Sequence, residues 1–181
     1  MNKEKEKKLL GEDRREWILN YLKNSSGPVT GTALAEKSNV SRQVIVGDIT
    51  LLKARNEPII ATSQGYLYMR IGNQGLAERI IACRHDRSQA EQELNIIVDH
   101  GVTVKDVTVE HPVYGDLTAS IMVSNRKDVQ AFLKSIRKTN ASLLLELTSG
   151  LHLHTLTAPD EQMILNAEKA LHEAGILAEE N

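Results

Sequence analysis

Apolar residues in the first part of the chain recur at helical spacing. One face of the segment 12–22 is apolar and consists of Trp17, Ile18, Tyr21 and Leu22, which predicts an amphipathic helix. A second helix is expected over 31–37, with Thr30 as its N-cap, and a third over 42–55, with Ser41 as its N-cap. Three short helices joined by such turns predict a helix-turn-helix arrangement.

Short strands follow these helices. Two strand-like runs, 58–62 and 66–70, flank the turn Ser63-Gln64-Gly65, which predicts the hairpin of a winged helix. From Gly72 on, the pattern predicts the order β-α-β-β-α-β-α, with strands at 78–84, 102–111, 117–123 and around His152, and helices at 88–100 (capped by Ser88), 128–138 and 159–174. The predicted fold class is α+β: a winged helix-turn-helix followed by a sandwich with helices on one face of a mostly antiparallel sheet.

The winged helix-turn-helix and the sandwich that follows it also differ in net charge. Residues 1–70 hold 12 Lys and Arg against 8 Asp and Glu, a balance of +4, whereas residues 71–181 hold 10 against 16, a balance of −6. A basic part and an acidic part favour different partners. We therefore expect a DNA-binding domain over 1–71 and a regulatory domain over 72–181.

The composition is that of an ordinary globular protein. Hydrophobic residues make up 41% and charged residues 25%, which argues against a fibrous or disordered chain. No apolar run approaches the roughly 20 residues of a membrane span and the first residues lack the apolar core of a signal peptide, so a cytoplasmic protein without a membrane partner is expected. The single cysteine, Cys83, has apolar neighbours and is interpreted as a buried thiol rather than a ligand.

Residues 10–70 resemble a known DNA-binding module. The segments Ala33-Leu34-Ala35-Glu36 and Val40-Ser41-Arg42-Gln43, together with Gly65-Tyr66, are similar to the winged helix of the biotin-repressor type. One position departs from that pattern, because Gly47 lies within the third helix where similar modules often carry a basic residue. Glycine there costs about 1 kcal/mol relative to alanine, and it either permits close approach to DNA or has no role.

The third helix carries the residues expected to contact DNA. In winged helices of this kind the start of that helix faces base edges in the major groove. Arg42 and Gln43 are therefore the expected base readers. Ser41, Thr50 and Lys53 are the expected phosphate contacts.

His152 and His154, separated by one residue, are the clearest candidates for chemistry. In an extended strand residues i and i+2 point to the same face. Both imidazoles are therefore expected to project together, with the other side of the strand formed largely by Leu151, Leu153 and Leu156. Such a pair is either a solvated strand face or half of a metal site.

His85 and Glu93 extend this pair. His85 lies where the first strand of the second part ends, and Glu93 lies early in the next helix, so the two side chains are expected to converge. Alternatively, His85 caps that helix and Glu93 is one of several solvated acids. Three imidazoles and one carboxylate suit a divalent transition metal, with nickel and zinc as first choices and iron and manganese as further ones, and no thiolate is expected to favour zinc.

Three separated signatures carry a second resemblance. His85-Asp86-Arg87, His111-Pro112-Val113-Tyr114-Gly115 and the segment 148–155 resemble those of the three-histidine, or 3H, domain. That domain follows a biotin-repressor-type winged helix in the niacin-responsive transcriptional repressors of NAD biosynthesis and niacin uptake. The resemblance implies a homodimeric repressor that binds double-stranded operator DNA and takes nicotinic acid as co-repressor. It also implies a metal held in the C-terminal domain by His85, Glu93, His152 and His154.

Nicotinate offers a pyridine nitrogen to a metal and a carboxylate that needs a cationic or hydrogen-bonding partner. Arg87, His111 and Tyr114 are the expected ligand contacts, although each also has a purely structural interpretation in a helix start, strand end or turn. Two other functions stay open: a metal-sensing regulator, and a metal-dependent hydrolase fused to a DNA-binding domain. A hydrolase is disfavoured, and no enzyme is expected, because Glu93 would serve as a ligand and no second acid is placed as a general base.

Overall fold

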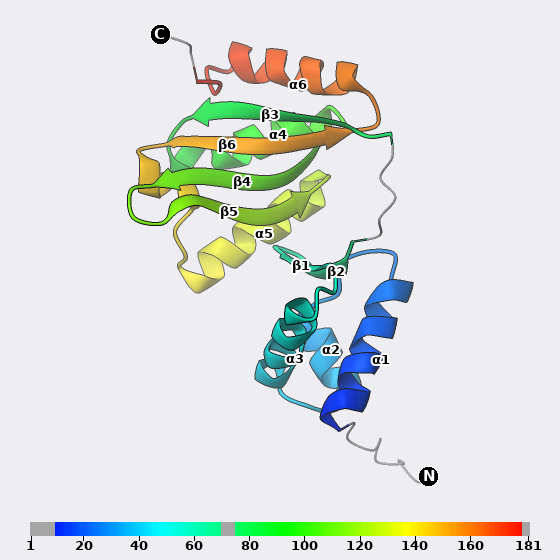
Figure 1. Ribbon diagram of the computed structural model, residues 1–181. Coiled ribbons are helices and arrows are strands. Elements are labelled where there is room, and N and C mark those ends of the chain that lie inside the picture. The colour runs from blue at the N-terminus through cyan, green and yellow to red at the C-terminus, as the bar shows by residue number, and fades with distance from the viewer. Residues whose placement is uncertain (1–9, 70–74, 179–181) are drawn as a thin grey trace. The chain divides into compact units, whose positions relative to one another are not determined.

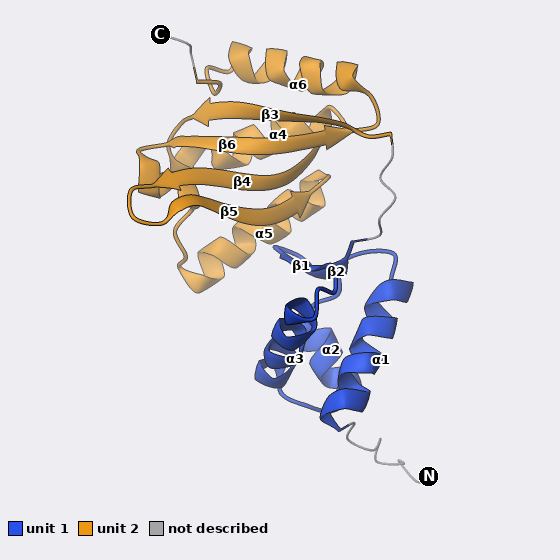
Figure 2. Cartoon of the chain, in the orientation of Figure 1, with its two compact units in different colours: residues 1–72 blue, residues 73–181 orange. Residues whose placement is uncertain are grey.

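The computed structural model describes residues 10–69 and 75–178. The chain divides into two compact units, residues 1–72 and 73–181 (Figure 2), each with its own hydrophobic core. The expected boundary between residues 71 and 72, and Arg70 at the end of the expected second wing strand, lie outside the described residues. No helix in the described part of the chain is both long and apolar enough to cross a membrane.

The first unit is a winged helix-turn-helix, as the sequence predicts. Its elements are α1 (Gly11–Asn24), α2 (Gly31–Ser38), α3 (Arg42–Ala54), β1 (Ile59–Thr62) and β2 (Gly65–Tyr68), and β1 and β2 form the antiparallel wing (Figure 1). The expected N-caps are present: Thr30 Oγ1 accepts a hydrogen bond from Ala33 N at 3.1 Å, and Ser41 Oγ accepts one from Val44 N at 3.4 Å. These caps fix where α2 and α3 begin.

A buried ion pair joins α1 to α3. Arg14 Nε donates to Asp48 Oδ2 at 2.6 Å, and Arg15 donates to Asp48 Oδ1 at 3.2 Å. The Asp48 side chain is only 4% exposed although it carries a charge. A buried carboxylate requires such partners, so the charged residues help to set how α1 and α3 pack around the apolar core.

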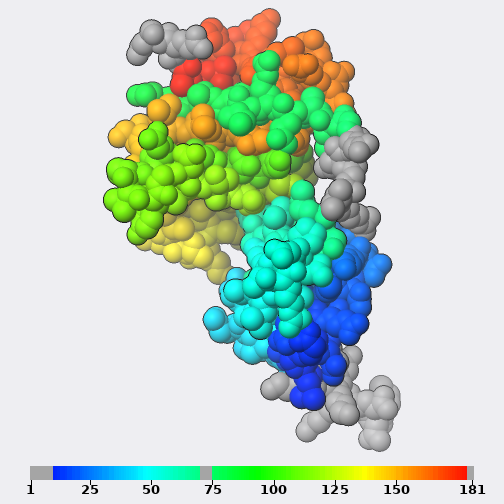
Figure 3. Space-filling model, viewed as in Figure 1, coloured from blue at the N-terminus to red at the C-terminus, as the bar shows by residue number. Residues whose placement is uncertain are grey.

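The second unit is a four-stranded antiparallel sheet with helices packed on one face. Its elements are β3 (Ala77–Arg84), α4 (Ala90–Asp99), β4 (Thr103–His111), β5 (Gly115–Val123), α5 (Arg126–Thr139), β6 (Leu151–Ala158) and α6 (Glu161–Glu173), and the strand order is β3-β6-β4-β5. Helices α4 and α5 lie behind the sheet in Figure 1, whereas no helix in the described part of the second unit covers the opposite face of the sheet, which is turned to the viewer in Figure 3. The predicted α+β class is confirmed.

Two local expectations are wrong. Ser88 does not cap α4, because Asp86 Oδ1 accepts a hydrogen bond from Ser88 N at 2.7 Å and begins a 3-10 turn, Arg87–Gln89, ahead of the helix. Leu156 does not lie opposite the two histidines. It shares their buried face, since side chains in a regular strand alternate with a period of two.

We expect Asp48→Ala to lower the free energy of unfolding of the first unit by about 3 kcal/mol, because Arg14 would keep its buried position without this carboxylate. Trp17 is the single tryptophan and packs against the core of this unit, so its fluorescence during urea unfolding is a suitable measurement. The matched control is Arg55→Ala, which removes an exposed ion pair with Glu12 and should change the midpoint little. Equally small shifts for both variants would contradict a structural role for the buried pair.

Candidate metal centre and ligand cavity

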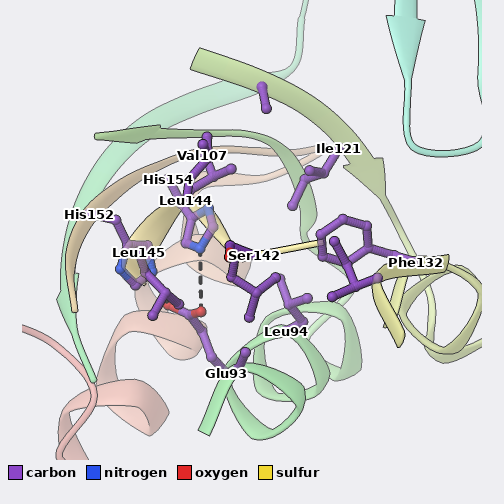
Figure 4. Close-up of a pocket in the computed structure, with 14 residues that line it drawn as sticks. Glu93, Leu94, Val107, Ile121, Phe132, Ser142, Leu144, Leu145, His152 and His154 are labelled. Atoms are coloured by element: carbon purple, nitrogen blue, oxygen red, sulfur yellow. Dashed lines mark hydrogen bonds and ion pairs between the residues drawn. The ribbon is translucent and has the colours of Figure 1, made fainter. Parts of the chain in front are cut away.

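Four polar side chains meet beneath the sheet of the second unit. Glu93 comes from α4, His152 and His154 from β6 (Figure 4), and His85 from the residue after β3. Their imidazole Nε2 atoms lie 2.8 Å (His85), 3.1 Å (His152) and 3.4 Å (His154) from carboxylate oxygens of Glu93. All four side chains are buried. The structure thus brings together the four residues that the sequence singles out as metal ligands.

A backbone carbonyl orients each imidazole. The Nδ1 atoms of His85, His152 and His154 lie 2.8 Å from the carbonyl oxygens of Asp86, Gly150 and Asp106, respectively. A carbonyl only accepts, so Nδ1 of each ring is assigned as the donor. In its neutral form, which carries one N–H, each ring then keeps the Nε2 lone pair that a metal ion requires.

His152 Nε2 lies within hydrogen-bond distance of Glu93 Oε1, at 3.1 Å, and the other two rings differ from it. His85 Nε2 and His154 Nε2 are buried and make no hydrogen bond, although both lie near the Glu93 carboxylate. Metal ligands at 2.0–2.2 Å from a common ion are separated by about 2.8–3.6 Å when the angles between them are about 90–110°. The spacings between Glu93 and the three imidazoles are of this size, so the residues present fit a divalent transition metal.

Local backbone features bring the rings into place. Gly150 has φ +92°, and a Cβ built there would lie 2.3 Å from the carbonyl oxygen of His85. Only glycine therefore allows the chain before β6 to pass this close to His85. On the neighbouring strand, β4 has a bulge between Val104 and Asp106, and it is the Asp106 carbonyl that orients His154.

Charge in the site is concentrated on Glu93. Burial opposes ionisation of this carboxyl, but the surrounding imidazoles, His154 foremost, hold its pKa well below the ordinary value. Burial likewise opposes the protonated forms of His85 and His154, yet the Glu93 carboxylate raises the pKa of both. The site therefore favours a positive charge beside the buried carboxylate.

A cavity of about 170 Å³ lies beside this cluster. An apolar cavity of about 150 Å³ holds one benzene molecule, so the space suits a single substituted six-membered ring. Glu93, His152 and His154 form its polar end (Figure 4). The rest of the lining is almost entirely apolar and includes Leu94, Val107, Ile121, Phe132, Ile136 and the segment 142–145, in which Ser142 supplies a hydroxyl.

The three residues expected to contact the ligand lie elsewhere. Arg87, His111 and Tyr114 are not among the residues that line the cavity. The Arg87 guanidinium lies 3.4 Å from Glu146. His111 and Tyr114 pack together at the turn between β4 and β5, with ring centroids 4.9 Å apart, and Tyr114 is 75% exposed. The sequence does not predict that the segment 142–145 lines the cavity, because its apolar residues follow neither a helical nor a strand period.

The residues expected to contact DNA lie on the surface of α3. Ser41, Arg42, Gln43, Thr50 and Lys53 are all exposed, whereas Ile45, Ile49 and Leu52 face the core. Gly47 is also exposed, and a Cβ built there meets no atom within 4 Å. Packing inside this unit therefore does not explain the glycine.

Comparisons with known proteins agree with this architecture. The model of a helix-turn-helix domain matches residues 14–67, and that of the 3H domain matches residues 78–180. The transcription repressor NadR of Bacillus subtilis is 62% identical over 174 residues, which cover 95% of this chain and 97% of that protein. The probable transcription repressor NiaR of Thermotoga maritima is 38% identical over 173 residues, which cover 96% and 98%. The chain therefore belongs to the niacin-responsive family of transcription repressors, non-enzymatic regulators in which a helix-turn-helix domain precedes a 3H domain.

Proposed function

We propose that this repressor acts as a homodimer on operators of genes for NAD biosynthesis and niacin uptake, with nicotinic acid as co-repressor. The observation that carries the proposal is the convergence of three imidazole Nε2 atoms and Glu93 at one end of a cavity of single-ring size. A regulator that senses only a metal has no need of the apolar part of that cavity. Its presence favours an organic effector over a metal-sensing role.

The cavity matches the two kinds of surface that nicotinic acid offers. A divalent metal bound by His85, Glu93, His152 and His154 would supply a coordination position for the pyridine nitrogen. Ile121 and Phe132, which line the cavity, would pack against the ring, and the Ser142 hydroxyl would bind the carboxylate. Arg87, His111 and Tyr114, none of which lines this cavity, stay predictions as contacts of the carboxylate.

Repression requires that the effector change the affinity for DNA. In a homodimer two α3 helices must match two half-sites on one face of the duplex. A ligand that selects one spacing of the two winged helices therefore changes DNA affinity without touching DNA. The Arg42 and Gln43 side chains are the proposed base readers, and Ser41, Thr50 and Lys53 the proposed phosphate contacts.

Arg42→Ala and Gln43→Ala are each expected to weaken binding to the preferred sequence about tenfold or more, because each removes a base contact. The measurement is fluorescence anisotropy at fixed salt, with a duplex that the wild-type protein selects from random-sequence DNA and a scrambled duplex for comparison. Lys134→Ala, which removes an exposed cation from the second unit, serves as the control. Unchanged affinity for the selected duplex in both α3 variants would exclude these residues as base readers.

Gly47→Ala is expected to stabilise the first unit by up to about 1 kcal/mol, because the added methyl group meets open space. If α3 approaches the DNA closely at this point, the same substitution lowers the affinity for the selected duplex. Urea unfolding followed by Trp17 fluorescence and anisotropy titration together check both effects. A gain in stability with unchanged DNA affinity would show that Gly47 has no part in DNA binding.

Nicotinic acid is expected to tighten binding of the metal-loaded protein to the selected duplex. The effect should disappear after chelation of the metal and in His152→Ala, because the pyridine nitrogen loses its partner. Nicotinamide, in which a neutral amide replaces the carboxylate, is the matched ligand control. DNA affinity that follows the metal but ignores nicotinic acid would instead support a metal-sensing regulator.

A further inference from the structure

Cys83 faces the same site as the histidines. Strands β3 and β6 are antiparallel, and Cys83 lies directly opposite His152, as Ile81 lies opposite His154. Directly opposed residues of antiparallel strands project to the same face, with Cβ atoms about 4.5–5.5 Å apart. Cys83 therefore points with His152 into the layer between the sheet and α4, where it has no exposed surface.

The sulfur lies within reach of the other donors. Cys83 Sγ, a carboxylate oxygen of Glu93 and an imidazole nitrogen of His152 all lie within 4.8 Å of one another. Independently of the cysteine, the Nε2 atoms of His85 and His154 are buried without a hydrogen bond and lie near the same carboxylate. The sulfur thus lies beside the carboxylate to which the other two imidazoles also turn.

We infer that Cys83 is a further ligand of the metal and supplies a thiolate to the donor set of Glu93 and the histidines. This inference rests on the metal site of the proposed function. As the metal–sulfur bond forms, the thiol loses its proton to solvent and the sulfur keeps the electron pair of the S–H bond. Without a metal, burial and then the nearby Glu93 carboxylate raise the pKa of the thiol, which keeps it neutral.

A thiolate changes which metals the site prefers. Imidazole and carboxylate ligands accept manganese and iron as well as zinc and nickel, whereas a soft sulfur ligand favours zinc, cobalt and nickel over manganese. The apolar neighbours of Cys83 along the chain predict a buried thiol, and the thiol is buried. Those neighbours do not reveal that β3 pairs with the strand of His152.

The test is the absorption spectrum of the full-length protein titrated with cobalt(II). Wild-type protein should show visible d–d bands of bound cobalt together with an intense near-ultraviolet sulfur-to-metal charge-transfer band. Because Cys83 is the single cysteine, that band has one possible thiolate source. Cys83→Ser should keep the visible bands and lose the charge-transfer band. Its zinc affinity should fall about tenfold or more, with a much smaller change for manganese.

A measurement on the unaltered protein avoids any folding defect of the variant. X-ray absorption of the zinc-loaded wild type should contain a zinc–sulfur distance of about 2.3 Å in addition to the nitrogen and oxygen shell at about 2.0–2.2 Å. Visible cobalt bands without charge transfer, and a zinc shell without sulfur, would overturn the role of Cys83 and leave the metal site intact. Wild-type protein that binds neither cobalt nor zinc would overturn both the inference and the metal site of the proposed function.

Discussion

The buried carboxylate of Glu93 is the charge around which the second unit is arranged. A carboxylate removed from water costs several kcal/mol unless partners compensate for it, and this side chain is only 2% exposed. Three imidazoles surround it, and each has its second nitrogen on a backbone carbonyl. The ring orientations are therefore fixed by the main chain. This explains why the unit needs Gly150 beside His85 and an irregular stretch in β4 beside His154.

Strand β6 contributes residues to both the polar site and the apolar core. Along β6 the inward-facing residues are His152 and His154, followed by Leu156 and Ala158. The first pair forms the polar end of the cavity, and the second pair belongs to the main hydrophobic cluster. Residues that hold the metal in the proposed function are consequently embedded in well-packed surroundings, where small displacements are resisted. Close packing of this kind would allow binding of the proposed metal and effector to affect the rest of the unit.

Sequence reasoning succeeded where periodicity and caps decide the structure. The helix-turn-helix, the wing, the antiparallel sheet and the caps Thr30 and Ser41 follow from local pattern, and the convergence of His85 and Glu93 follows from a strand end that adjoins a helix start. It failed for features that depend on contacts between segments far apart in the sequence. The β3–β6 register, which places Cys83 opposite His152, has no local signature. The Arg14–Asp48 pair and the cavity-lining segment 142–145 have no periodic signature at all.

His152 and His154 lie beside Glu93 and also line the cavity. Because the same two side chains would contact the metal and the effector, the binding of one would change the affinity for the other. A ring in the cavity must contact the imidazoles that hold the metal, so the two binding free energies are coupled and the coupling is reciprocal. In the proposed function, the metal would raise the affinity for the effector by the same factor as the effector would raise the affinity for the metal. The apolar lining contributes a part of the effector's affinity that does not depend on the metal, about 25 cal/mol per Å² of apolar surface buried. Specificity for a pyridine over a benzene ring must therefore come from the polar end, where Glu93, His152 and His154 set the charge and the geometry.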